Sequence, residues 1–336
     1  MECCTYDGDP PDFKKSKIKI KNNYMDLSQV QGQHSARRAL EICASGGHNL
    51  LMSGPPGTGK SMLANRLPGI LPPMNECQAL ETASIYSISS QGFQIENWQT
   101  RPFRAPHHTL SSVALAGGGS KPKPGEISLA HNGVLFLDEL PEYTRNTLEV
   151  LREPMESGKI QISRANDSQM FPASFQLIAA MNPCPCGYNG DKQHACKCTQ
   201  NQIQNYHNRL SSPFLDRIDM QIHMPRIPSI ELARTTENEK SADVADRVSA
   251  AYQIQNSRQF CQNARLDNTQ VKKFCHLDTP SKQLLTRATD KLQLSMRAYY
   301  RVLKISRTIA DLQNHQTIQQ SHIAEAINYR QQQINN

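Results

Sequence analysis

The chain has 336 residues, a net charge of +7 and 38 % hydrophobic residues, enough for a packed core in roughly two or three domains. No apolar run is long enough to cross a bilayer and the amino end lacks a signal-like apolar core, so we expect a cytoplasmic protein without membrane association. In that compartment the ten cysteines should stay reduced, which excludes a disulfide scaffold and leaves burial or metal binding. The basic balance fits a polyanionic partner without identifying it.

Residues 1–23 are predicted to be a flexible leader or linker. They contain Pro10, Pro11 and a lysine-rich stretch over 14–19, with little to bury. A solvated leader is the preferred interpretation, and a nucleic-acid-binding arm is the alternative. From Asp26 the chain becomes ordered, and apolar residues at helical spacing predict a helix that ends at Gly46.

A glycine-rich loop follows an apolar strand over 50–52 and precedes a helix. This is the pattern and context of a phosphate-binding loop, with a Gly/Pro-rich turn as the plain alternative. Lys60 is expected to reach the β- and γ-phosphates of ATP, and Ser61 to hold Mg²⁺. The residues predicted to bind the nucleotide are Gly54, Pro55, Pro56, Gly57, Thr58, Gly59, Lys60, Ser61 and Met62.

A second apolar strand, over 134–137, ends in Asp138 and Glu139. Ligands of open α/β sheets bind at the carboxyl ends of the strands, so both acids are expected at the nucleotide. Asp138 is the expected Mg²⁺ partner, and Glu139 is expected to orient and activate the attacking water. A further strand, over 176–180, leads to Asn182, whose amide can contact the γ-phosphate or that water.

The long interval between these two motifs leaves room for an insertion. Three glycines followed by Lys121 and Lys123 predict a mobile basic loop tip that contacts a phosphate backbone, and a flexible connection is the alternative. His107 and His108 are expected to pack or to form hydrogen bonds rather than to bind a metal.

Residues 144–157 predict one helix, capped by Thr144 and closed by Gly158. Beyond it, residues 159–163 and 170–175 are predicted to pair as a hairpin. Arg164 at its tip is a second candidate for a DNA contact, or an ordinary solvated side chain.

Four cysteines follow Asn182 in two C-x-C pairs: Cys184, Cys186, Cys196 and Cys198. Four thiols match the ligand count of a tetrahedral Zn²⁺ site, and His194 is a possible substitute ligand. The alternative is a loop with four reduced thiols.

Arg217 lies between a helix and an apolar strand over 220–224. From there it can project into the nucleotide of a neighbouring subunit, which requires an oligomer; the alternative is a local salt bridge with Asp219. After residue 228 the composition turns helical and polar, which predicts an all-helical lid. Arg297, near the start of one of its helices, is expected to reach the nucleotide at the domain boundary.

These motifs resemble those of the ComM/YifB family of AAA+ ATPases, relatives of the small subunit of magnesium chelatase. The resemblance lies in residues 46–51, 103–108, 124–133, 182–187 and 295–299. It extends over residues 24–330, and the paired C-x-C motif is its most particular feature.

The resemblance implies an α/β AAA+ P-loop NTPase core over 24–228, with a parallel sheet flanked by helices, and a C-terminal all-helical lid over 229–336. Within the core it implies a helix-2 insert at about 101–130, a pre-sensor-1 hairpin at about 159–175 and a Cys-rich loop at 184–198. It further implies a homo-hexameric ring in which Arg217 is the arginine finger, Asn182 sensor 1 and Arg297 sensor 2.

The function that the resemblance implies is an ATP- and Mg²⁺-dependent motor on single-stranded or branched DNA. Such a motor promotes branch migration, as a helicase, while transforming DNA is integrated by homologous recombination, with recombinase and competence proteins as partners. Family members usually carry a Lon-protease-like domain before the ATPase, whereas this chain begins almost at the ATPase. Two alternatives act on a protein partner instead: a magnesium-chelatase-like motor subunit and a MoxR-like remodelling ATPase.

Overall fold

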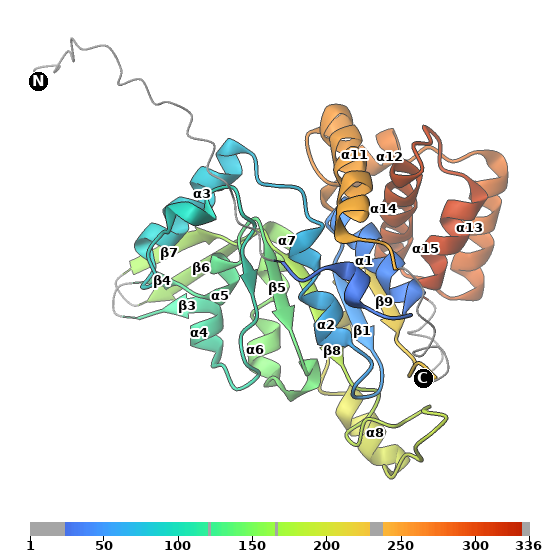
Figure 1. Cartoon of the computed structure of the whole chain (residues 1–336), viewed down its shortest axis with the longest axis horizontal. Helices are drawn as coiled ribbons and strands as arrows, with labels where there is room; N and C mark the ends of the chain where they lie inside the picture. The colour runs from blue at the N-terminus through green and yellow to red at the C-terminus, as the bar shows by residue number, and fades with distance from the viewer. Residues whose placement is uncertain (1–23, 120–121, 165–166, 229–237, 331–336) are drawn as a thin grey trace, which may run out of the picture.

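The computed structural model describes residues 24–119, 122–164, 167–228 and 238–330, so the predicted leader lies outside the described residues. Its centre is a five-stranded sheet with the order β2–β5–β8–β1–β9 (Figure 1). All four neighbouring pairs are parallel, so the carboxyl ends of the strands lie at one edge. The strands are β1 (Leu50–Ser53), β2 (Phe103–Arg104), β5 (Val134–Leu137), β8 (Gln176–Met181) and β9 (Met220–His223).

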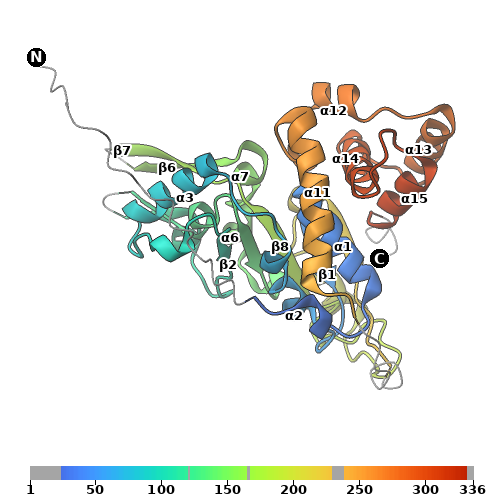
Figure 2. The ribbon, with the colours of Figure 1, turned by 45° about the horizontal axis from the view of Figure 1, so that its top comes forward.

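Helices cover both faces of the sheet, which is why the central strands are apolar at successive positions. On β1, Leu50 and Met52 pack into one apolar layer and Leu51 into the other. The first layer contains α1 (His34–Gly46) and α2 (Lys60–Ala64), and it continues without a break into the C-terminal helices. Figures 1 and 2 show those helices gathered on one side of the molecule. They are α11 (Ser241–Gln259), α12 (Asn268–Phe274), α13 (Thr279–Lys291), α14 (Met296–Leu312) and α15 (Gln320–Asn328).

The second layer contains short helices and two antiparallel hairpins. Its helices are α4 (Ser112–Ala116), α5 (Glu126–Leu129), α6 (Arg145–Glu149), α7 (Arg152–Ser157), α8 (Gln200–His207) and α9 (Ser212–Leu215), with α3 (Glu76–Ile88) beside them. One hairpin pairs β3 (Gly117–Gly118) with β4 (Lys123–Pro124), and the other pairs β6 (Lys159–Arg164) with β7 (Asp167–Pro172). The returning strand β7 therefore begins and ends earlier than the predicted 170–175.

The single helix predicted over 144–157 is wrong, because the chain forms α6 and α7 there with a turn between them. Thr144 caps α6, and Gly158 with φ of 68° ends α7, as predicted. Pro154 explains the break, since proline has no N–H to donate to the carbonyl of Val150 and its ring crowds the preceding turn.

The predicted fold class is confirmed: a parallel sheet flanked by helices is followed by an all-helical C-terminal region. None of the helices in the described ranges combines the length and the hydropathy that a membrane span requires.

Candidate functional site

Three adjacent strands, β5, β8 and β1, bring the predicted nucleotide-binding residues to one edge of the sheet. The Lys60 ammonium donates hydrogen bonds to the carbonyl oxygens of Gly54 and Pro55, at 2.7 and 2.9 Å, and to Asn182 Oδ1 at 3.2 Å. The Ser61 hydroxyl lies 2.5 Å from Asp138 Oδ2. Residues far apart in the sequence thus meet because parallel strands end at the same edge.

The backbone of the loop after β1 requires its glycines. Gly57 and Gly59 adopt φ of 79° and 87°, a region that favours glycine. Gly54 is required for a different reason, since a Cβ there would lie 2.3 Å from the Met224 carbonyl oxygen. The Thr58 hydroxyl donates to the Pro55 carbonyl at 3.0 Å and so closes the loop. The sequence predicted this loop from the spacing of its glycines between an apolar strand and a helix.

Met62 is the predicted nucleotide contact that the structure supports least. Its side chain in α2 is exposed and carries no charged or hydrogen-bonding group. A contact with a nucleotide at this position would be apolar, unlike the polar contacts that Lys60 and Ser61 offer.

Burial lowers the pKa of Lys60 from 10.5 to about 8, while the charges of Asp138 and Glu139 oppose that shift. The cause is desolvation, which penalises the ammonium form in a largely enclosed site. A polyphosphate placed beside Lys60 would favour the charged form again, so the loop can take up a proton with its ligand.

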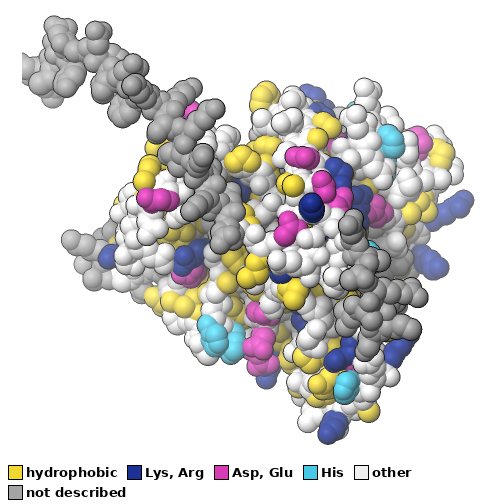
Figure 3. Space-filling model, in the orientation of Figure 1, with side chains coloured by type: hydrophobic (Ala, Val, Ile, Leu, Met, Phe, Trp, Pro, Cys, Tyr) yellow, Lys and Arg dark blue, Asp and Glu magenta, His cyan; other side chains and the backbone are white. Residues whose placement is uncertain are grey.

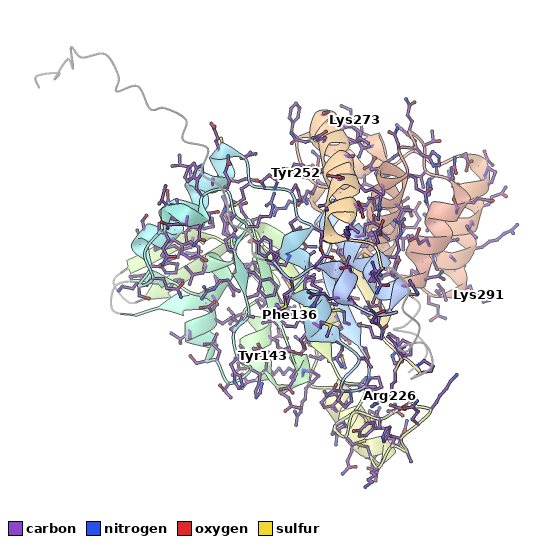
Figure 4. All side chains as sticks on the ribbon, in the orientation of Figure 1. Phe136, Tyr143, Arg226, Tyr252, Lys273 and Lys291 are labelled. Carbon is purple, nitrogen blue, oxygen red and sulfur yellow. The ribbon has the colours of Figure 1, made fainter. Side chains whose placement is uncertain are left out.

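Glu139 lies at the exposed rim of the site and pairs with a histidine. Its side chain is 54 % exposed, and Oε2 lies 3.1 Å from His108 Nδ1. Its backbone has φ of 51°, and its N–H donates to Asp138 Oδ1 at 2.9 Å. Tyr143, labelled in Figure 4, holds the loop that contains His108, because its hydroxyl donates to the Pro106 carbonyl at 2.6 Å.

The sequence prediction missed the pairing of His108 with Glu139. It expected hydrogen bonding for the two histidines but had no signal for the partner. His107 accordingly contacts Thr109, with 2.9 Å between Nδ1 and Oγ1, and its ring lies 4.1 Å from that of His108.

The four cysteines of the C-x-C pairs form a cluster whose sulfur atoms all lie within 4.8 Å of one another. Three of the Sγ–Sγ distances are 3.4 Å for Cys184–Cys186, 3.6 Å for Cys184–Cys196 and 3.6 Å for Cys186–Cys196. Zn–S bonds of about 2.3 Å place the sulfurs of a tetrahedron about 3.8 Å apart, so the cluster fits Zn²⁺. The backbone N–H of Cys186 also points at Cys198 Sγ, at 3.4 Å.

His194, the predicted substitute ligand, is not part of that group. Its ring stacks on Tyr188, with 5.0 Å between the ring centroids. Among the residues that the structure describes, four thiols and no imidazole are therefore grouped for a metal ion at this place.

The Cys-rich loop is built against the phosphate-binding loop. A Cβ on Gly187 would lie 2.7 Å from Pro56 Cδ. Arg226, labelled in Figure 4, reaches Asp191 of the Cys-rich loop at 3.2 Å and the Pro56 carbonyl at 3.5 Å. The loop and α8 project from the end of the sheet at which β1 ends (Figure 1). A change in the conformation of the Cys-rich loop would therefore disturb the phosphate-binding loop.

Arg217 lies at the opposite edge of the sheet from Lys60. Asn49, which directly precedes β1, donates to the Arg217 carbonyl at 3.2 Å. The four residues of β1 span about 13 Å, so Arg217 belongs to the amino edge and Lys60 to the carboxyl edge. The predicted local alternative, a salt bridge with Asp219, is not formed: Arg217 pairs with Glu156, and Asp219 pairs with Arg301.

Arg297 shares that edge and one partner with Arg217. Its Nη2 lies 3.0 Å from Glu156 Oε1, while Arg217 Nη2 lies 3.0 Å from Glu156 Oε2. Farther along the same helix, Arg301 donates to the Ile218 carbonyl at 3.0 Å and so holds α14 at this edge. The structure thus places Arg297 beside Arg217 and away from the nucleotide loop of its own chain. The sequence had predicted that Arg297 would reach the nucleotide at the domain boundary, and the structure does not bring it there.

Two of the three predicted DNA contacts, Lys123 and Arg164, belong to the two hairpins. Lys123 is exposed on β4, and Arg164 stands opposite Asp167 at the last position of the β6–β7 ladder. Lys121 lies outside the described residues. On the face drawn in Figure 3, lysine and arginine side chains are dispersed rather than gathered into one patch.

Comparison with known proteins gives the chain a family. The model of the magnesium chelatase subunit ChlI matches residues 26–232, and that of the ChlI C-terminal region matches residues 238–330. The chain is 53 % identical over 310 residues to competence protein ComM of Haemophilus influenzae, and this match covers 92 % of the chain and 60 % of ComM. It is 50 % identical over 307 residues to the uncharacterized protein YifB of Salmonella typhimurium, with 91 % and 60 % covered.

A more distant relative is the magnesium-chelatase 38 kDa subunit of Rhodobacter capsulatus, 26 % identical over 179 residues, which cover 47 % of this chain and 50 % of that subunit. The chain thus spans 60 % of the length of ComM and of YifB. The chain belongs to the family of the magnesium chelatase subunit ChlI within the AAA+ proteins, and ComM and YifB are its homologues.

Proposed function

We propose that this chain is the ATP-hydrolysing part of a cytoplasmic ring motor that acts on DNA. The observation that carries the proposal is the meeting of Lys60, Ser61, Asp138 and Asn182 at the ends of three adjacent strands. A phosphate-binding lysine, a hydroxyl–carboxylate pair and an amide are the groups that phosphoryl transfer to water requires at one place.

Each residue of the site has its own proposed role in hydrolysis. Ser61 and Asp138 would hold Mg²⁺, which neutralises the charge of the phosphates when it is bound. Lys60 binds the β- and γ-phosphates, and Asn182 orients the γ-phosphate or the attacking water. Glu139 positions that water and accepts its proton, for which its exposed rim position gives access.

Hydrolysis in this proposal takes place between subunits of a homo-hexamer. Arg217 and Arg297 lie at the edge of the sheet away from Lys60, so we assign them to the nucleotide of a neighbouring chain. There they stabilise the negative charge that develops on the γ-phosphate. Mixing Arg217→Ala chains with chains that are inactive at Glu139 should restore turnover, because each provides what the other lacks.

DNA is the proposed substrate of the motor. The relative ComM is named a competence protein. The two hairpins carry Lys123 and Arg164, which together with Lys121 would provide basic contacts for a phosphate backbone. We propose branch migration, a helicase activity, during homologous recombination of transforming DNA, with recombinase and competence proteins as partners.

Zn²⁺ is proposed as a structural ion of the Cys-rich loop. The fit of four sulfur atoms within 4.8 Å of one another supports it. Zinc bound there would fix the loop against Pro56 and so help to shape the phosphate-binding loop.

A second candidate is a motor that remodels a protein, as a magnesium-chelatase-like or MoxR-like subunit does. Both family models that match this chain describe a magnesium chelatase subunit, and this observation supports the protein-remodelling candidate. Stimulation by DNA separates the two candidates.

The experiment is steady-state ATP hydrolysis with and without single-stranded, duplex and branched DNA. Glu139→Gln, which should bind ATP without turning it over, is the blank. Strong stimulation by DNA supports the DNA motor. In a sample shown to form rings, no stimulation would reject the DNA motor in favour of protein remodelling, and turnover by Glu139→Gln would reject the role of Glu139.

A further inference from the structure

The carboxylate of Glu156 forms ion pairs with both arginines at the amino edge of the sheet. Oε2 lies 3.0 Å from Arg217 Nη2, and Oε1 lies 3.0 Å from Arg297 Nη2. Glu156 stands in α7, Arg217 follows α9, and Arg297 is the second residue of α14. One side chain therefore links three elements that are far apart in the sequence.

Apart from their shared ion pairing with Glu156, the two arginines differ in how firmly their side chains are held. The side chain of Arg217 is 10 % exposed, and its Nε and Nη1 donate to the carbonyls of Arg152 and Pro213, at 3.1 and 2.6 Å. Backbone thus fixes the Arg217 guanidinium and leaves its Nη2 to the carboxylate. Arg297, 49 % exposed, pairs with Glu156, which is itself 44 % exposed. Arg297 is free to turn once that pair opens.

The charges favour exchange of the carboxylate for a stronger anion. Two guanidinium groups share one carboxylate, so the group keeps a net positive charge. Ion pairs that are half exposed contribute little to stability. A triphosphate brings more negative charge and more acceptor oxygens than a carboxylate, and it suits the planar donors of arginine.

We propose that Glu156 is a positioning residue that aligns Arg217 and Arg297 as a pair for the polyphosphate of a second copy of this chain. The arriving phosphates replace the carboxylate on both arginines, so Glu156 holds the pair ready and competes with the nucleotide at the same time. This inference rests on the proposed function, because it requires a nucleotide at the junction between copies.

The test compares Glu156→Gln with Glu153→Gln, which makes the same change of charge on the same helix. Glu153 is exposed and forms no ion pair with any described residue, so it controls for the charge of α7. With the competing carboxylate removed, Glu156→Gln should lower the KM for ATP about three- to tenfold, the scale of one or two weak ion pairs. The amide that replaces the carboxylate can still accept a hydrogen bond from one of the two arginines, so the alignment is weakened rather than lost, and kcat should fall relative to the control. A KM equal to or above that of Glu153→Gln overturns the proposal.

A second readout does not require hydrolysis. Assembly of the full chain is followed by analytical ultracentrifugation as the non-hydrolysable analogue AMP-PNP is added. Glu156→Gln should assemble at a lower AMP-PNP concentration than Glu153→Gln. If the wild type assembles but does not hydrolyse ATP, the proposed hydrolysis fails while this comparison still decides on Glu156. No assembly by any of the chains would overturn the inference.

A last comparison asks whether Glu156 acts through the arginines. In a chain that carries Arg217→Ala and Arg297→Ala, adding Glu156→Gln should not change the AMP-PNP concentration needed for assembly. A further shift in that background would mean that Glu156 acts through other groups, and the proposal would be wrong.

Discussion

Binding of ATP should draw a proton onto Lys60, and the size of this uptake follows from the structure. Burial holds the pKa of free Lys60 at about 8, so about half of the side chains are neutral at pH 8 and about nine tenths at pH 9. Phosphates beside the lysine raise its pKa, so bound Lys60 is charged throughout this range. The expected uptake per nucleotide is about 0.5 proton at pH 8, about 0.9 at pH 9 and near zero below pH 7. Binding should therefore weaken as the pH rises above about 8.

Isothermal titration calorimetry with AMP-PNP and Mg²⁺ measures this uptake, when each titration is repeated in two buffers of different ionisation enthalpy. The phosphate itself has a second pKa of about 6 and stays fully ionised at pH 8. Lys282→Met, which removes an exposed lysine of α13, is the matched control and should show the same uptake. Tight binding without proton uptake at both pH 8 and pH 9 would refute the reasoning, because Lys60 would then be charged before the nucleotide arrives.

Three further predictions concern stability and the Cys-rich loop. Asp311→Asn should lower the free energy of unfolding by about 3–5 kcal/mol, because the buried carboxylate accepts from Arg258 at 2.7 and 2.9 Å; a loss under about 1 kcal/mol in urea unfolding would contradict this. Burial lowers the pKa of His48 from 6.5 to about 4, so its neutral form stabilises the fold above pH 6.5. About 3 kcal/mol of that stability is lost as the pH falls to about 4, and His48→Gln should flatten this part of the pH profile relative to wild type. Cys184→Ser should reduce the zinc content measured by mass spectrometry and weaken ATP binding, since the loop packs on Pro56; unchanged ATP affinity after zinc loss would separate the two sites.

The nucleotide edge was predictable because its information is local. Glycines at fixed spacing between a strand and a helix identify the phosphate-binding loop, and the φ values of Gly57 and Gly59 show why other residues do not fit. Asp138 and Asn182 were predictable because each directly follows a buried apolar run. Once the strands are parallel, their ends must meet, and Lys60 contacts Asn182 as a result.

Local pattern also failed at identifiable places. The residues over 144–157 have the apolar spacing of one helix, yet Pro154 divides it into α6 and α7. The two histidines gave no sign that His108 would lie 3.1 Å from Glu139. That contact joins the loop after β2 to the end of β5. The two strands are neighbours in the sheet, and the strand order is a property of the tertiary structure.

The sequence by itself therefore determined the chemistry of the chain: the phosphate-binding loop, the two acids, the paired cysteines and the apolar strands that these groups follow. Only the tertiary structure decided at which edge of the sheet the two arginines lie. Arg217 and Arg297 lie away from Lys60 and share Glu156 because the crossings between strands and the packing of α14 put them there. Residue types and spacing encode local geometry and reactivity, whereas the meeting of distant segments depends on how the whole core packs.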